Sequence, residues 1–206
     1  LIDIINDPNV RVVSQLKNTF NGISRYQDFK YYKYTIDVDT RSAIGFSKTA
    51  RSSWYRNSSD VKTWSVIHND TSLRGAAIVS YSRLLNGNLN FTFTPSNSTP
   101  SYITQTNIIG LISKTENIYF PAVLSPSKKY TLLLQTQKTT DFLTKVRNDI
   151  TYSYSSDGYN LQSVVMSQNY LNTTLQGTTT TSTLYDSNIS GTGSGYYIGR
   201  PSEMTT

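Results

Sequence analysis

The sequence predicts an all-β fold. Its 206 residues include 16 tyrosines and long runs of threonine and serine. Tyr, Thr, Val, Ile and Phe favour pleated, half-buried strands. Several stretches also alternate apolar and polar residues with a period of two, which is the pattern of a strand with one buried side. The length is that of one domain with a sizeable core.

The composition excludes several classes of site. The chain has no cysteine, which rules out a disulfide scaffold, a thiol nucleophile and cysteine-ligated metals. No apolar run approaches the roughly 18–20 residues of a membrane-spanning helix. The net charge is +6, but the bases are spread out, and only Arg200 follows Asp149. We therefore expect contact with nucleic acid only through termini beyond this sequence, and Leu1 suggests a processed or partial chain.

Three regions are predicted. Residues 1–30 read as an N-terminal arm with weak periodicity. Residues 31–170 hold most of the alternating stretches and read as a β-sandwich domain. Residues 171–206 are rich in Thr, Ser and Gly, but interspersed leucines and tyrosines can anchor them, so we expect an extended C-terminal segment lying on a surface.

The best-patterned stretch runs from Asp70 to Pro95. Apolar residues recur there at spacings of three and four, which predicts a short helix capped by Asp70 or Thr71. The helical positions are Leu73, Ala77, Tyr81, Leu84 and Leu85. Asn86-Gly87 then marks a turn, and alternation from Leu89 to Phe93 predicts a strand.

A rival interpretation makes residues 78–85 a strand in a two-residue hairpin around Asn86-Gly87. That register pairs Leu84 with Leu89 and Ser82 with Phe91. The apolar side of the second strand would then meet serines, so we prefer the helix and keep the hairpin as the alternative.

Alternation and composition predict the other strands, and dipeptides such as Asn21-Gly22 and Asp157-Gly158 predict turns. Residues 141–148 are expected to form one or two helical turns. The predicted strands cover residues 34–38, 43–46, 54–55, 63–67, 102–112, 130–135, 150–154 and 164–166.

Few residues are candidates for chemistry. Asp37 and Asp39 share one side of a strand and suggest either a cation site or a solvated edge; no third carboxylate is near in sequence, so we favour the edge. His68 is the only histidine, and we expect a structural role because catalysis needs a nucleophile or an orienting acid beside it. No nucleotide-binding or hydrolase motif occurs. We therefore assign no catalytic, cofactor-binding or metal-binding residue and expect no enzyme.

Two further features suggest surface contacts. The tyrosine clusters, Tyr31-Tyr32 with Tyr34 and Tyr196-Tyr197, suit protein contacts or a ligand platform, or simple packing at the rim of a sandwich. Six glycosylation sequons begin at Asn57, Asn69, Asn90, Asn97, Asn172 and Asn188. Several of them are expected by chance in a sequence this rich in Asn, Ser and Thr.

Residues 73–93 resemble the jelly-roll capsid proteins of picornaviruses and picorna-like RNA viruses. The matching residues are Leu73-Arg74, Tyr81-x-Arg83 and Phe91-Thr92-Phe93. A second similar segment is Phe120-Pro121 through Ser125-Pro126, followed by Tyr130. The family's Pro-Pro-Gly-containing link between the two segments is absent, and the Thr-rich end has no counterpart.

The resemblance implies an eight-stranded jelly-roll β-sandwich that builds an icosahedral shell around RNA. Its partners would be other copies of the chain, sibling capsid proteins, genomic RNA through the termini and a host receptor, and its location the virion. The alternative is an extracellular adhesin, fibre or surface-layer subunit. A third interpretation is an enzyme or sugar-binding β-sandwich, with Tyr196 or Trp64 as candidate sugar contacts.

Overall fold

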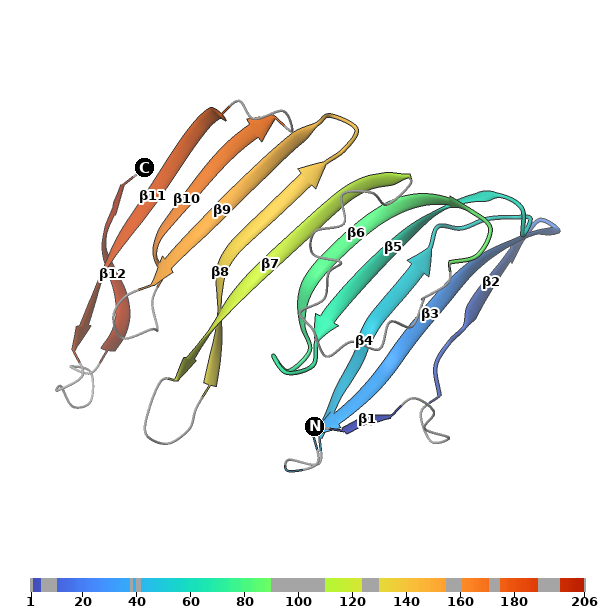
Figure 1. Cartoon of the computed structure of the whole chain (residues 1–206), viewed down its shortest axis with the longest axis horizontal. Helices are drawn as coiled ribbons and strands as arrows, with labels where there is room; N and C mark the ends of the chain where they lie inside the picture. Colours follow the sequence, from blue (N-terminus) through green and yellow to red (C-terminus); the bar gives the residue numbers. More distant parts are fainter. Residues whose placement is uncertain are drawn as a thin grey trace. The chain divides into compact units, whose positions relative to one another are not determined.

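All regular structure in the described part of the chain is β-strand, which confirms the all-β prediction (Figure 1). None of these residues forms a helix that is long and apolar enough to cross a membrane. The computed structural model describes residues 2–4, 11–37, 39, 42–89, 110–123, 130–154, 161–170, 175–188 and 197–205.

The chain divides into two compact units, Leu1–Glu116 and Asn117–Thr206. The first unit is an antiparallel sheet with strand order β1-β3-β4-β5-β6-β7, and β2 pairs with β3 beside β1. Its strands are β1 (Ile2–Ile4), β2 (Gln15–Phe20), β3 (Ile23–Asp37), β4 (Ser42–Ser52), β5 (Val61–Asp70), β6 (Ala76–Asn86) and the first half of β7 (Leu111–Val123).

The second unit continues from β7 with strand order β8-β9-β10-β11-β12. Successive strands pair antiparallel, for example Ile150 of β9 with Met166 of β10. The Thr-rich end contributes a paired hairpin, β11 with β12. The strands of this unit are β8 (Tyr130–Asp141), β9 (Val146–Tyr154), β10 (Leu161–Tyr170), β11 (Leu175–Asn188) and β12 (Tyr197–Thr205).

The order of the described strands does not confirm a jelly roll. A jelly roll is built from Greek keys, in which a long connection brings distant strands side by side. Here every described strand after β2 pairs with the next one along the chain, and only β1 pairs with a strand further on. This is a meander.

The predicted short helix after Asp70 is wrong. Residues 71–75 form a tight turn and β6 follows at once, so the region is a β5–β6 hairpin. Asp70 does act as a cap, because its carboxylate accepts from the backbone N–H of Ser72 at 2.8 Å, but it caps a turn. Arg74 and Gly75 end that turn with positive φ angles of 54° and 80°, which interrupt any helix before it could begin.

The rival hairpin around Asn86-Gly87 identified the strand correctly but not its partners. β6 pairs with β5 on one side and with β7 on the other, where Ser82 lies opposite Ser113. The supposed partner residues after Leu89 lie outside the described part, as do Asp157-Gly158, Tyr196 and most of residues 102–112. The helical turns expected within residues 141–148 are also wrong: residues 142–145 form the turn between β8 and β9.

The core of the first unit is built by alternate residues of β5, which include polar as well as apolar side chains. Along β5 every second residue is buried, and the residues between are mostly exposed. The buried set is Lys62, Trp64, Val66 and His68. Trp64 and Val66 pack with Ala50 of β4 and with Leu89, which follows β6 and lies over the same side of the sheet. The period of two along β5 thus separates its buried side chains from the more exposed ones.

The second unit buries almost nothing. Among its described side chains only Thr140 is buried, and that side chain is polar. The two sides of the β9–β10 pair nevertheless differ in polarity. Ile150, Tyr152, Val164 and Met166 are neighbours on one side, whereas Arg147, Asp149 and Asn169 lie together on the other. Its described apolar side is thus left without a buried core.

Candidate functional site

A buried ion pair joins β3 to β5 in the first unit. The ammonium of Lys62 lies 3.0 Å from a carboxylate oxygen of Asp28. Lys62 is only 1% exposed and Asp28 8%. A buried charge is costly unless it is paired and hydrogen-bonded, so each of these groups depends on the other.

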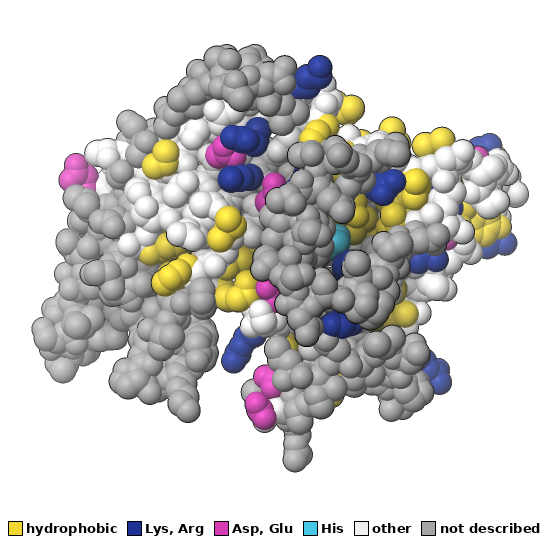
Figure 2. All heavy atoms as spheres, viewed as in Figure 1, with side chains coloured by type: hydrophobic (Ala, Val, Ile, Leu, Met, Phe, Trp, Pro, Cys, Tyr) yellow, Lys and Arg dark blue, Asp and Glu magenta, His cyan; other side chains and the backbone are white. Residues whose placement is uncertain are grey.

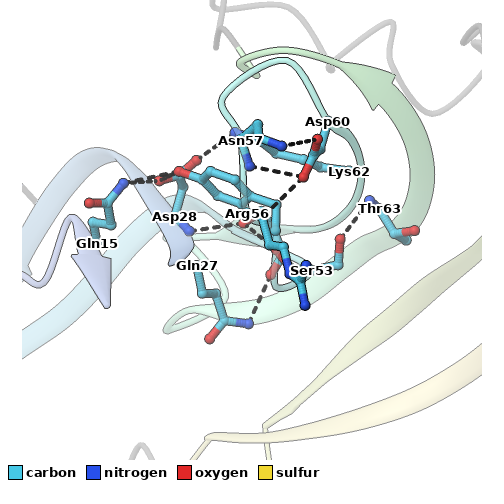
Figure 3. Close-up of polar contacts among 11 residues, drawn as sticks. Gln15, Gln27, Asp28, Ser53, Arg56, Asn57, Asp60, Lys62 and Thr63 are labelled. Carbon is cyan, nitrogen blue, oxygen red and sulfur yellow. Dashed lines mark hydrogen bonds and ion pairs between the residues drawn. The ribbon is translucent and has the colours of Figure 1, made fainter. Parts of the chain in front are cut away.

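Two more side chains complete the cluster (Figure 3). The Tyr55 hydroxyl donates to the other Asp28 oxygen at 2.7 Å, and Gln15 of β2 donates to that same oxygen at 2.8 Å. The Lys62 ammonium also lies 3.6 Å from the centre of the Tyr55 ring, a close cation–π contact. We call Gln15, Asp28, Tyr55 and Lys62 the Asp28 cluster.

The electrostatics of the Asp28 cluster favour fixed protonation states. Burial raises the pKa of Tyr55, and its hydrogen bond to the Asp28 carboxylate raises it further, to about 12. Burial also raises the pKa of Asp28, but hydrogen bonds from Gln15, Tyr55 and Lys62 outweigh it, so the net shift is downward. Near neutral pH the phenol stays protonated and the carboxylate ionised, which suits a structural clamp rather than a proton-transfer centre.

The Asp28 cluster positions the loop between β4 and β5. Tyr26 of β3 and Tyr55 of the loop exchange backbone hydrogen bonds at 2.8 and 2.9 Å. At the far end of the loop, one carboxylate oxygen of Asp60 accepts from the backbone N–H groups of Arg56 and Asn57, each at 2.9 Å (Figure 3). These bonds hold Arg56 against the β2–β3 hairpin.

Arg56 and the β2–β3 hairpin line an open pocket of about 240 Å³. We call it the hairpin pocket; its lining residues are Asn18, Phe20, Ile23, Arg25 and Arg56. The hairpin turns at Asn21-Gly22, as predicted, with φ angles of 48° and 74°, and this double positive φ is what a two-residue turn between twisted strands requires. Two guanidinium groups beside apolar side chains suit an anion attached to an apolar group.

Asp37 and Asp39 lie at the end of β3, and the Asp37 carboxylate accepts from the backbone N–H of Asp39 at 3.1 Å. That bond makes a turn at the strand end. Within the described residues no group of three or more His, Cys, Asp or Glu side chains is placed to hold a metal ion.

His68 is buried among aromatic and basic neighbours. Its ring centre lies 5.7 Å from that of Tyr81, and Lys48 is its cross-strand partner. Burial lowers the pKa of His68 to about 4, with a further contribution from the Lys48 charge. The imidazole is therefore neutral at physiological pH.

The tyrosines near residue 31 do not form one platform. Tyr31 and Tyr34 pack on Phe46 with ring centres 4.9 and 5.1 Å apart, whereas the ammonium of Lys48 lies 5.4 Å from the centre of the Tyr32 ring. Each tyrosine is thus engaged in packing within the sheet.

The structure describes the asparagine side chains of two sequons. Asn57 lies in the exposed loop that carries Arg56. Asn69 lies within β5, and its amide nitrogen donates to the Phe46 carbonyl at 2.9 Å. The other four sequons lie outside the described side chains.

Sequence reasoning missed the Asp28 cluster and the hairpin pocket. The signal for the cluster was present: Lys62 continues the alternation of Trp64 and Val66 by one step, which puts a lysine on an apolar side of a strand. Nothing local identified Asp28 as its partner, since 34 residues separate the two.

No family model, no curated protein and no solved structure matches this chain.

Proposed function

We propose that this chain is a structural subunit that assembles with other copies of itself, and with sibling subunits, into a protein shell. The role is that of a coat protein in a virion. No catalytic, cofactor or metal site is part of this role.

One observation carries it: the second unit has an apolar side that its described residues bury only in part. Ile150, Tyr152, Val164 and Met166 are adjacent there, and Met166 is 42% exposed. Apolar burial is the main favourable term in folding, so a sheet with this side uncovered gains stability when another subunit covers it.

The capsid form of this role draws on the resemblance of residues 73–93 and 120–130 to picorna-like coat proteins. Genomic RNA, bound through the chain termini, and a host receptor would be the further partners. Figure 2 shows scattered Lys and Arg side chains on a largely uncharged described surface. Such a surface suits broad contact between subunits.

The second candidate is an extracellular fibre, adhesin or surface-layer subunit. The strand order favours it, because a jelly roll needs Greek-key neighbours and the described strands form a meander. An open meander can extend edge to edge into filaments or lattices.

Electron microscopy and sedimentation of the purified full chain test the proposal. Closed shells support a coat protein, and filaments or flat lattices support the second candidate. A monomer at high concentration, with no assemblies in either measurement, would refute both.

Two neighbouring substitutions locate the interface. Met166 and Ser167 are adjacent on β10 and lie on opposite sides of the sheet. Met166→Glu is expected to reduce assembly strongly, because it places a charge on the apolar side. Ser167→Lys places a charge on the other side of the sheet, opposite Asp149, and is the matched control; it is expected to leave assembly unchanged, and equal effects would contradict this interface.

A further inference from the structure

The β2–β3 hairpin presents an unprotected sheet edge. Among the strands that the structure describes, β2 pairs with β3 alone, and Figure 1 shows it at the margin of the first unit. Its six residues are all exposed, and they include no proline and no bulge. Natural proteins usually protect such an edge; the one charged side chain of β2 is Lys17, whose ammonium lies 5.9 Å from the centre of the Tyr26 ring, so the strand is a template for another strand with an acidic partner.

The register shows which backbone groups of β2 face outward. Phe20 and Ile23 flank the two-residue turn and therefore exchange hydrogen bonds, and so do alternate pairs behind them. Lys17 and Thr19 fall between those pairs. Tyr26, the partner of Lys17, donates its backbone N–H to Tyr55 instead. The N–H and C=O groups of Lys17 and Thr19 are thus directed away from β3.

The side chains on the pocket side of the hairpin combine apolar and basic groups. Leu16, Phe20 and Ile23 are 43%, 75% and 47% exposed. Asn18 lies opposite Arg25 between them, and Arg56 completes the hairpin pocket. The sequence from Arg11 to Gln27 contains three bases and no acid.

From this combination of free edge, apolar strip and arginine pair, we infer that β2 binds an extended, acidic and apolar segment of a partner protein by strand addition. The partner's backbone pairs with Lys17 and Thr19. Its apolar side chains cover Leu16 and Phe20, and a carboxylate enters the hairpin pocket between Arg25 and Arg56. A second copy fits less well, because pairing β2 with itself brings together two basic strands without an acid. This interaction does not depend on the proposed assembly, since a monomer presents the same edge.

The test uses the purified full chain and a labelled synthetic peptide of the pattern Val-Thr-Glu-Thr-Phe, which places valine, glutamate and phenylalanine together on one side of the added strand. Fluorescence anisotropy is expected to show saturable binding. The same peptide with lysine in place of glutamate is expected to bind at least about tenfold more weakly, which corresponds to about 1.4 kcal/mol. Absence of saturable binding of the acidic peptide would overturn the inference, whether or not the chain assembles.

Thr19→Pro removes an outward N–H and keeps the β2–β3 bonds, so it is expected to weaken binding by about tenfold. Thr19→Val, which keeps the N–H, is the matched control and is expected to bind like the parent chain. If Thr19→Pro does not fold, peptides N-methylated at alternate amides replace it, and one of the two methylation patterns is expected to abolish binding. Binding that survives every backbone change would overturn strand addition.

Arg25→Gln with Arg56→Gln tests the pocket and is expected to weaken peptide binding by about tenfold or more. A uridine oligonucleotide is the competing probe. If it displaces the peptide and binds Thr19→Pro as well as the parent chain, the basic patch recognises phosphates and the inference is wrong.

Discussion

The ammonium of Lys62 lies 3.0 Å from the carboxylate of Asp28. The pair joins two strands that are not neighbours, β3 and β5, across the intervening β4. Backbone hydrogen bonds join only neighbouring strands, so this ion pair adds a direct connection between β3 and β5.

Lys62→Met is expected to lower the free energy of unfolding by about 3–5 kcal/mol, because it leaves the buried Asp28 carboxylate without its cation. Urea denaturation measures this. The exposed Lys138 gives the matched control, and Lys138→Met should change stability by less than about 0.5 kcal/mol. The double variant with Asp28→Asn should lose less than the sum of the single losses; additivity would show that the two groups are not coupled.

Stability should fall between pH 7 and pH 5 because of His68. The imidazole titrates near 6.5 when unfolded and near 4 when folded, so the unfolded state binds more protons in this range. The expected loss at pH 5 is about 2 kcal/mol, from about 1.4 kcal/mol per pKa unit.

Urea unfolding of the parent chain at the two pH values checks this, with His68→Gln as the comparison. The variant's stability should change much less over the same interval. Equal pH dependence in both proteins would contradict a neutral, buried His68.

Gly110→Ala should be strongly destabilising. A Cβ at this position would lie 2.3 Å from the Leu84 carbonyl oxygen, and the φ angle is 74°. That carbonyl cannot withdraw freely, since the Leu84 N–H donates to the Gly110 carbonyl at 2.7 Å where β7 begins. Gly87→Ala is the control: its φ is 85°, but nothing lies within 4 Å. The control should lose only the backbone cost of about 1–2 kcal/mol, and Gly110→Ala clearly more in thermal unfolding.

Leu89→Ala should cost about 2–5 kcal/mol, because it opens a cavity over Trp64 and Val66. Leu143 lies in the β8–β9 turn and is 73% exposed, so Leu143→Ala serves as the control and should be nearly neutral. Similar small losses in both variants, measured by chemical denaturation, would show that Leu89 does not belong to the core.

The strands were predictable where alternation was strong. Residues 150–154 and 63–67 lie in β9 and β5 as expected, because side chains that alternate between two environments leave a period of two in the sequence. The predicted helix after Asp70 was wrong because a strand pattern with a period of two also contains spacings of four. Along β6, Val79, Tyr81 and Leu85 share a side at spacings of two and four, and the spacing of four between Tyr81 and Leu85 also fits a helix. Gly75 was the decisive residue, since its positive φ completes a hairpin turn.

The Asp28 cluster was beyond local patterns. Gln15, Asp28, Tyr55 and Lys62 come from two strands, a loop and a third strand, and only strand register brings them together. The hairpin pocket likewise needs Arg56, which the fold places beside a hairpin some 30 residues earlier in the chain. Such sites are set by pairing and connection lengths rather than by composition.

The meander has a consequence for how the chain reaches its fold. Nearly every described strand pair joins consecutive strands, so most contacts close short loops and the sheet can grow one hairpin at a time during synthesis. The pairing of β1 with β3, Ile2 opposite Ile36, is the exception among them. This pairing can form only after the β2–β3 hairpin has emerged and turned at Asn21-Gly22. Formation of that turn therefore determines when the N-terminal edge of the sheet is completed.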